Sequence, residues 1–378
     1  MSDTQLVRAA VDARLATESE IQTCIAKRDK LKAQGKDYKL ADILVKTGVV
    51  TSSQLKRLQT SPAEDSGSQS FLHLPGFHVK QKIGAGAMAS VYKAKQLSLD
   101  RTVAIKILPK KLSEDPEFVQ RFYKEGKAAA KLNHANIVQA IDVGEYSGYH
   151  YFVMEFVDGE TVYDKLIRNR VYNEAEALHI IIQIAKALEH AHAKGLIHRD
   201  VKPKNIMITK DQVAKLADMG LARQADDAAA AEAEKGRAFG TPYYISPEQI
   251  RGVADVDFRA DIYSLGATLY HMVTGKVPFE GSTPASIMQK HLKQTLTPPD
   301  HLNKSLSTGM AEVVERMMSK DRNVRYQSTG DLLIDLERVR DGKSPLQARG
   351  AYTSNKLLEG LTDGSQEDIA EFATHNSM

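Results

Sequence analysis

The sequence predicts an α+β protein with two lobes, a small one rich in strands and a larger helical one, preceded by a helical appendage. Extended, β-branched segments come first after position 74, and helical patterns follow to about position 340. Residues 1–60 are charged and favour helix, and a small polar stretch separates them from the rest. Because 378 residues exceed what one hydrophobic core usually serves, we expect one large unit and one smaller one.

Composition excludes several classes of protein. The 51 Lys+Arg and 48 Asp+Glu residues leave a formal charge of +3, which argues against nucleic-acid binding as the main role. Cys24 is the only cysteine, so an internal disulfide and a Cys-ligated structural zinc are both excluded. No stretch reaches the roughly 18 apolar residues of a membrane span, and the N-terminus lacks a signal pattern. We expect a soluble, cytoplasmic protein without a membrane span.

The appendage, residues 1–60, contains a weak internal repeat in which Thr17 and Thr51 occupy equivalent positions. Each threonine begins a capping-box pattern, so each is predicted to start a helix. Residues 39–55 resemble the helical N-terminal domain of pilus and secretion ATPases, some of which bind cyclic dinucleotides, although Ala41 stands where those domains usually have glycine. We expect a regulatory or docking module that binds a protein partner, with nucleotide binding as the alternative.

The remaining boundaries follow from composition. Residues 61–73 are small and polar, have almost nothing to bury, and are predicted to form a flexible linker. The main domain is expected to cover residues 74–340. Residues 341–378 are polar and contain Gly, Ser and Thr, so we expect a disordered tail.

Residues 83–91, with the sequence IGAGAMASV, form a glycine-containing turn between two predicted strands. Gly84 and Gly86 would allow the backbone to approach a phosphate group closely. An ordinary β-hairpin explains the same residues when they are taken alone. The pattern therefore predicts a phosphate-binding loop only in combination with the residues that follow.

The run Val103-Ala104-Ile105-Lys106 follows at a suitable distance, and its alternation places Ala104 and Lys106 on the same face of a strand. The Asp-Pro pair at 115–116 predicts a helix start, and Glu125 falls on the stripe of that helix that faces the core. Because an unpaired buried charge is costly, we expect Lys106 and Glu125 to form an ion pair that holds the lysine toward phosphate oxygens.

Three further motifs are more specific. They are HRDVKPKN at 198–205, ADMG at 217–220 and GTPYYISPE at 240–248. With the preceding residues, they make the chain from about Phe77 to Arg340 similar to the eukaryotic-type (Hanks-type) protein kinase family, in its bacterial serine/threonine branch. The resemblance implies a bilobal protein-kinase-like fold.

The resemblance also implies an activity and its cofactors, ATP and Mg²⁺. The expected reaction transfers the γ-phosphoryl group of ATP to Ser/Thr hydroxyls of protein substrates, including the kinase itself, as in signalling. Asp200 would orient the hydroxyl and accept its proton, and Lys202 and Thr241 complete the serine/threonine-type arrangement. Asn205 and Asp218 would ligate the metal.

By the same resemblance, Met154 is the gatekeeper and the backbone of Glu155 and Val157 hydrogen-bonds the adenine. Two positions depart from the usual pattern, because Ala89 replaces the third loop glycine and Met219 replaces a phenylalanine. The implied ATP-binding positions are Ile83, Gly84, Ala85, Gly86, Ala87, Met88, Ala89, Ser90, Val91, Ala104, Lys106, Glu125, Met154, Glu155, Val157, Asn205 and Asp218.

Other residues are expected to be structural. The resemblance implies that Glu248 pairs with Arg325 and that Asp261 anchors the backbone of the catalytic loop. His190 and His192 could suggest a metal site, but side chains two positions apart on a helix point to different faces. We therefore expect structural histidines.

Two other classes of function share this fold. A pseudokinase scaffold would have lost an essential group, whereas Lys106, Glu125, Asp200, Asn205 and Asp218 are all present. A small-molecule kinase is disfavoured because residues 241–248 match a protein-substrate platform. We therefore expect an active protein kinase.

The segment between Gly220 and Thr241 contains no Ser, Thr or Tyr, so the usual phosphate that pairs with Arg199 has no acceptor there. Three interpretations stay open: an acidic residue pairs permanently with Arg199, a short alanine-rich helix blocks the cleft, or the loop is simply solvated. The acidic residues are Asp226, Asp227, Glu232 and Glu234.

Overall fold

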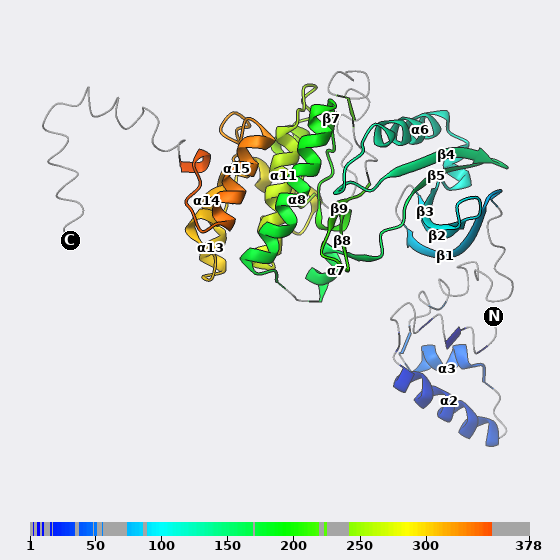
Figure 1. Ribbon diagram of the computed structural model, residues 1–378. Coiled ribbons are helices and arrows are strands. Elements are labelled where there is room, and N and C mark those ends of the chain that lie inside the picture. Colours follow the sequence, from blue (N-terminus) through cyan, green and yellow to red (C-terminus); the bar gives the residue numbers. More distant parts are fainter. Residues whose placement is uncertain are drawn as a thin grey trace, which may run out of the picture. The chain divides into compact units, whose positions relative to one another are not determined.

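The computed structural model divides the chain into two compact units, Met1–Leu72 and His73–Met378 (Figure 1). The division falls at the end of the segment that the sequence assigned to a linker. Among the described residues, no helix is long and apolar enough to cross a membrane. The structure describes residues 3, 6–7, 10, 16, 18–34, 38–47, 49–50, 55, 74–85, 89–168, 171–218, 223–224 and 242–349.

The described part of the first unit includes the helices α2 (Glu18–Ala33) and α3 (Leu40–Lys46). Ile21 and Cys24 on α2 and Leu40 on α3 are almost fully buried in one apolar cluster. The Cys24 thiol also lies 3.3 Å from the Thr47 hydroxyl, directly after α3. The two predicted capping boxes lie outside the described residues, and the docking role of this unit stays a prediction.

The second unit begins with an antiparallel sheet whose strand order is β1-β2-β3-β5-β4. Alternating β-branched residues explain the central position of β3, because both of its faces are covered and Val103 and Ile105 are fully buried. Lys106 on β3 lies opposite Val91 on β2 and Phe152 on β5. The strands are β1 (Phe77–Ala85), β2 (Ser90–Gln96), β3 (Arg101–Ile107), β4 (Ala140–Tyr146) and β5 (Tyr149–Glu155).

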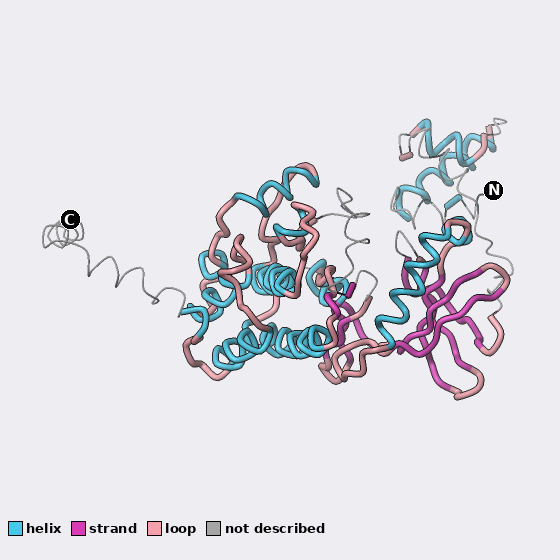
Figure 2. Tube along the Cα trace, turned by 90° about the horizontal axis from the view of Figure 1, so that it is seen from above, coloured by secondary structure: helices cyan, strands magenta, loops and turns pink. Residues whose placement is uncertain are grey.

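One long helix, α6 (Pro116–Ala130), covers a face of this sheet (Figure 2). It begins at the proline that the sequence marked as a helix start, after the short helix α5 (Lys110–Ser113). Phe122 faces the sheet and is 6% exposed. At Gly126 the helix comes so close to β5 that an added Cβ would lie 3.3 Å from the Phe152 ring.

The larger lobe is helical, with α8 and α11 at its centre and α14 and α15 packed beside them (Figure 1). Helix α8 starts with the capping box of Asn173 and Glu176, and apolar residues at helical spacing bury its inner face. Helix α11 is buried along nearly its whole length and ends at Gly275, whose φ of +70° suits glycine. The helices are α7 (Val162–Ile167), α8 (Glu174–Ala193), α10 (Pro247–Ile250), α11 (Arg259–Thr274), α12 (Pro284–Lys293), α13 (Pro299–Leu302), α14 (Thr308–Met317) and α15 (Thr329–Arg340).

Short strands connect the two lobes. Leu216 on β9 accepts a hydrogen bond from the Val138 N–H at 2.9 Å and donates one to the Asn136 carbonyl at 2.8 Å, so the segment before β4 is tied to the helical lobe. The loops around these strands carry the residues of the active-site motifs. The strands are β6 (Gly159–Thr161), β7 (Leu196–Ile197), β8 (Ile206–Thr209), β9 (Ala214–Leu216) and β10 (Arg223–Gln224), and a 3₁₀ turn, η1, covers Pro203–Asn205.

Residues 343–349, which we call the C-terminal strap, fold back on α14 and α15. The buried Asp335 carboxylate on α15 accepts hydrogen bonds from the backbone N–H groups of residues 346, 347 and 348, at 2.6, 3.1 and 2.8 Å. It also accepts one from the Tyr326 hydroxyl, and Arg349 pairs with Glu312. The sequence placed these residues in a polar tail beginning at 341, whereas the strap is packed; residues 350–378 lie outside the described residues.

We expect Asp335→Ala to lower the free energy of unfolding of the second unit by at least ~2 kcal/mol, since it leaves buried donors without an acceptor. Chemical denaturation of the full chain measures this change. Asp341→Ala is the control, because Asp341 is exposed and pairs with its neighbour Arg340. An equal effect of both substitutions would contradict a special role for Asp335.

Candidate active site

A pocket of about 310 Å³ opens between the sheet and the helical lobe. Its walls come from the sheet, from α6 and from the loops around β8 and β9. The lining residues are Ile83, Gly84, Val91, Ala104, Lys106, Phe122, Gly126, Ala129, Val138, Phe152, Met154, Glu155, Phe156, Val157, Lys204, Asn205, Met207, Ala217 and Asp218.

Ten of the seventeen positions that the sequence assigned to ATP line this pocket. Ala89 and Ser90 are described but do not line it. Residues 86–88 and the side chains of Ala85 and Glu125 lie outside the described residues, and so does Thr241. The ten lining positions are Ile83, Gly84, Val91, Ala104, Lys106, Met154, Glu155, Val157, Asn205 and Asp218.

Sequence reasoning did not assign the inner apolar wall of the pocket, which includes Phe122, Gly126 and Phe152. The buried stripe of α6 contained the signal, because Phe122 belongs to it. The stripe indicated only which face of α6 is buried. It did not indicate that this face packs against β5 beside the pocket.

Lys106 and Asp218 meet in the pocket. The Lys106 Nζ donates to Asp218 Oδ1 at 2.8 Å, which joins β3 to the segment after β9. Removal from water would raise the pKa of the Asp218 carboxyl, but Lys106, with smaller contributions from His198 and Lys202, keeps that pKa below its ordinary value. Asp218 is therefore an anion at neutral pH, and its φ of +60° lies in the left-handed region that few non-glycine residues adopt.

The chain leaves β5 through Glu155, at the edge of the pocket. The Glu155 N–H donates to the Gln139 carbonyl at 2.9 Å, so Glu155 could meet an adenine only through its own carbonyl. The Glu155 carboxylate is held by Lys215 of β9 at 2.9 Å. This ion pair connects the end of β5 to β9 of the helical lobe.

Asp200 lies in the loop between β7 and η1, among groups that hold its carboxylate. The Lys202 ammonium donates to Asp200 Oδ2 at 2.5 Å, and Asn205 Nδ2 donates to the same oxygen at 3.1 Å and to the Asp200 carbonyl at 2.9 Å. The resemblance gave each of these three residues a role in the reaction, and in the structure they are in contact with one another.

The backbone of this loop is fixed by His198. Its Nε2 donates to the Ala217 carbonyl at 3.2 Å, so Nδ1 is the acceptor for the Asp200 N–H, also at 3.2 Å. These two bonds set the tautomer of a fully buried imidazole and connect the loop to the residue before Asp218.

Asp261 on α11 anchors the backbone of the loop that carries Asp200, as the resemblance implied. Its carboxylate accepts from the His198 N–H at 2.9 Å and from the Arg199 N–H at 2.7 Å. Arg199 has a φ of +67°, and these bonds hold that strained conformation.

The donor atoms of the pocket suit a hard divalent cation. Because Asn205 Nδ2 is bound to Asp200, the amide oxygen of Asn205 is the atom able to ligate a metal, and Asp218 offers the second carboxylate oxygen. Both are oxygen ligands of the kind that Mg²⁺ prefers. Among the described residues, no group of three or more His, Cys, Asp or Glu could hold a metal ion.

Residues 77–332 match the protein kinase domain family. The chain belongs to the protein kinase family. Kinases of this family use ATP and a divalent metal ion, which agrees with the oxygen ligands of Asn205 and Asp218.

Similar proteins include bacterial kinases. A probable serine/threonine-protein kinase of Clostridium perfringens is 39% identical over 264 residues, which cover 70% of this chain and 38% of that protein. The serine/threonine-protein kinase PknB of Mycobacterium tuberculosis is 38% identical over 273 residues, covering 71% and 44%. This chain thus spans less than half of the length of these relatives. The solved kinase domain of Mycobacterium tuberculosis PknI is 29% identical, with a TM-score of 0.56 over 71% of this chain and 98% of that one.

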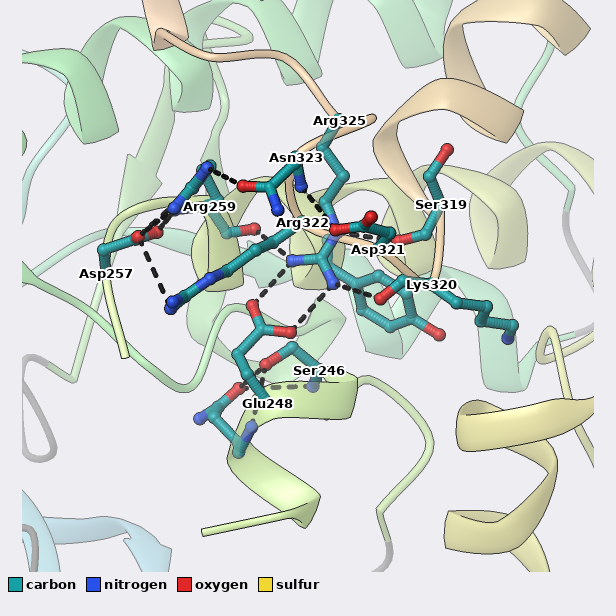
Figure 3. Close-up of polar contacts among 12 residues, drawn as sticks. Ser246, Glu248, Asp257, Arg259, Ser319, Lys320, Asp321, Arg322, Asn323 and Arg325 are labelled. Atoms are coloured by element: carbon teal, nitrogen blue, oxygen red, sulfur yellow. Dashed lines mark hydrogen bonds and ion pairs between the residues drawn. The ribbon is translucent and has the colours of Figure 1, made fainter. Parts of the chain in front are cut away.

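Helix α10 is held by a buried ion pair. Arg325 and Glu248 form two short bonds, at 2.6 and 2.8 Å, as the resemblance implied. The Arg325 guanidinium lies between Glu248 and the loop that begins at Ser319 (Figure 3). Arg325 is fully buried and Glu248 is 4% exposed, so neither charge can turn to water instead.

Two histidines, His271 on α11 and His291 on α12, are uncharged at neutral pH. The Tyr244 hydroxyl and His271 Nδ1 form a hydrogen bond at 2.8 Å, and burial lowers the His271 pKa to about 4. Burial, with help from Lys320, lowers the His291 pKa to about 3, and Tyr263 bonds its Nδ1 at 2.8 Å. Tyr244 and Tyr263 are therefore each bonded to an uncharged imidazole at neutral pH.

These pKa values predict acid sensitivity. Below about pH 6.5 the two histidines are protonated in the unfolded chain but stay neutral in the folded chain. The free energy of unfolding therefore falls as pH falls, by up to ~1.4 kcal/mol per pH unit for each histidine. His271→Gln keeps an acceptor for Tyr244 but cannot titrate. Urea denaturation at pH 7.5 and 5.5 should show a smaller acid loss in this variant than in the wild type, and equal losses would contradict the assignment.

Proposed function

We propose that this chain is a serine/threonine protein kinase that transfers the γ-phosphoryl group of ATP to protein hydroxyls. The observation that carries the proposal is the arrangement of Asp200, Lys202 and Asn205 next to the pocket that contains the Lys106–Asp218 pair. Together they supply a proton acceptor, cations for phosphate oxygens and metal ligands. Phosphoryl transfer needs these three kinds of group.

Each group has a distinct task in this mechanism. The Asp200 carboxylate orients the substrate hydroxyl and accepts its proton, and Lys202, at 2.5 Å from that carboxylate, stabilises the negative charge that develops on the transferred group. Lys106 aligns the phosphates. Bound Mg²⁺ would neutralise phosphate charge, held by the Asn205 amide oxygen and the Asp218 carboxylate.

A pseudokinase is the rival from another class, and the same residues argue against it. Such a scaffold could keep the fold while losing the Asp200 contacts or a metal ligand. In this chain Asp200 is held by two side chains, and Asn205 and Asp218 both line the pocket. These positions support chemistry as well as a scaffold.

The test is a transfer assay with γ-labelled ATP, Mg²⁺ and myelin basic protein, followed by acid hydrolysis to identify the labelled amino acid. We expect phosphoserine and phosphothreonine on the substrate and on the kinase itself. Label in phosphotyrosine alone would overturn the serine/threonine assignment. Absence of any label, beside a control kinase that labels the same substrate, would favour the scaffold.

A further inference from the structure

A chain of polar side chains runs from α15 to the catalytic loop through His192. His192 lies in the last turn of α8, and its side chain is 10% exposed. Its Nε2 lies 2.8 Å from Asp261 Oδ2 and its Nδ1 lies 2.9 Å from the Thr329 hydroxyl. Thr329 is the first residue of α15 and is 5% exposed.

The directions of these bonds follow from the charge of Asp261. Burial would raise the pKa of this carboxyl, but the hydrogen bond from His192 is the strongest of the contacts that lower it, and the pKa lies below its ordinary value. The ionised carboxylate can only accept, so His192 Nε2 carries a proton. The Thr329 hydroxyl can donate to a neutral Nδ1 or accept from a protonated one, and it therefore holds the ring in either state.

The orientation of the His192 ring matters because the Asp261 carboxylate binds both this ring and the backbone of the catalytic loop. One carboxylate oxygen accepts from His192 and from the His198 N–H, and the other accepts from the Arg199 N–H, the residue before Asp200. A rotated His192 ring would remove one donor from a carboxylate that is 0% exposed. The carboxylate would then move to recover that bond, and the loop that it holds would move with it.

The Thr329 hydroxyl is not needed to start α15. Ser328 is the N-cap residue, and its side chain already accepts from the Asp331 N–H. Thr308 offers an internal comparison, since it is the first residue of α14 after the N-cap Ser307 and is exposed. The two threonines share a helix position, and at Thr329 the hydroxyl contacts a histidine.

We propose that Thr329 is a positioning residue for phosphoryl transfer, acting through the His192 ring and the Asp261 carboxylate on the backbone that carries Asp200. This inference rests on the proposed function. It adds to that function a residue on α15, outside the pocket and outside the catalytic loop. Small displacements of a reacting group cost large factors in rate, so even an indirect contact can matter.

The experiment compares Thr329→Val, which removes the hydroxyl at nearly constant volume, with Thr329→Ser, which keeps it. Steady-state kinetics with myelin basic protein should show kcat of Thr329→Val reduced ~10-fold, KM for ATP unchanged, and kcat largely restored in Thr329→Ser. Thr308→Val should behave as the wild type. Thermal unfolding confirms that each variant is folded at the assay temperature, and Thr329→Ala, which also lacks the hydroxyl, replaces Thr329→Val if that variant does not fold.

Three results would overturn the inference. They are wild-type kcat in the folded variants without the hydroxyl, an equal loss in Thr329→Ser, which would indicate packing, and a raised KM with unchanged kcat. No transfer by the wild type would instead refute the proposed function, and this inference with it, before any variant is compared.

Discussion

Asp200→Asn is expected to lower the rate of phosphoryl transfer at least ~100-fold while leaving the chain folded. The amide has nearly the same shape, but it can neither accept the hydroxyl proton nor carry the charge that holds the Lys202 ammonium at 2.5 Å. Lys106→Ala and Asp218→Asn should cause losses of similar size, because each removes phosphate alignment or a metal ligand. Steady-state assays of the purified variants measure the effect.

The matched control is Asp211→Asn, which makes the same change at an exposed turn between β8 and β9. It should leave the rate unchanged. Near-normal turnover by a folded Asp200→Asn variant would mean that another group orients the acceptor hydroxyl.

Arg325→Met should have the largest effect on stability, a loss of ~3–5 kcal/mol in the free energy of unfolding. The substitution leaves Glu248 buried and charged without its partner, and it also removes a donor to the Ser319 and Arg259 carbonyls. Arg325→Lys should recover only part of the loss, since an ammonium cannot bind a carboxylate through two parallel bonds. Chemical denaturation of the full chain measures both variants.

Arg322→Ala provides the comparison for Arg325. Arg322 pairs with Asp255, whose side chain is 72% exposed, and its guanidinium also lies 3.7 Å from the Asp257 carboxylate; ion pairs open to solvent contribute less than ~1 kcal/mol each. If the two arginine variants lost the same stability, burial would not be what makes the Arg325–Glu248 pair important.

The part of the fold that local patterns determine could be predicted from the sequence. Alternating residues around Val103 indicated the central strand β3, and the Asp-Pro pair indicated the start of α6. The C-terminal strap could not be predicted, because its residues show no apolar periodicity of a helix or a strand. It is ordered by Asp335, a single buried carboxylate on α15, and no local pattern indicates which backbone a carboxylate will bind.

In the active site, too, the sequence indicated what lies within one motif and did not indicate some contacts between distant segments. The motif at 198–205 placed Asp200, Lys202 and Asn205 in one loop, and in the structure their side chains are in contact. The sequence assigned Lys106 and Asp218 to the same pocket but not to each other, because their ion pair depends on how the lobes pack. The contact between His192 and Thr329 likewise joins two helices that are distant in sequence.

Intact-mass spectrometry of a substrate protein tests the central claim most directly. Myelin basic protein is incubated with Mg²⁺ and ATP, and with either the wild-type chain or its Asp200→Asn variant at equal concentration. The account predicts added phosphoryl groups on the substrate with the wild type and none with the variant. An unchanged substrate mass with the wild type, or the same additions with both proteins, would contradict it.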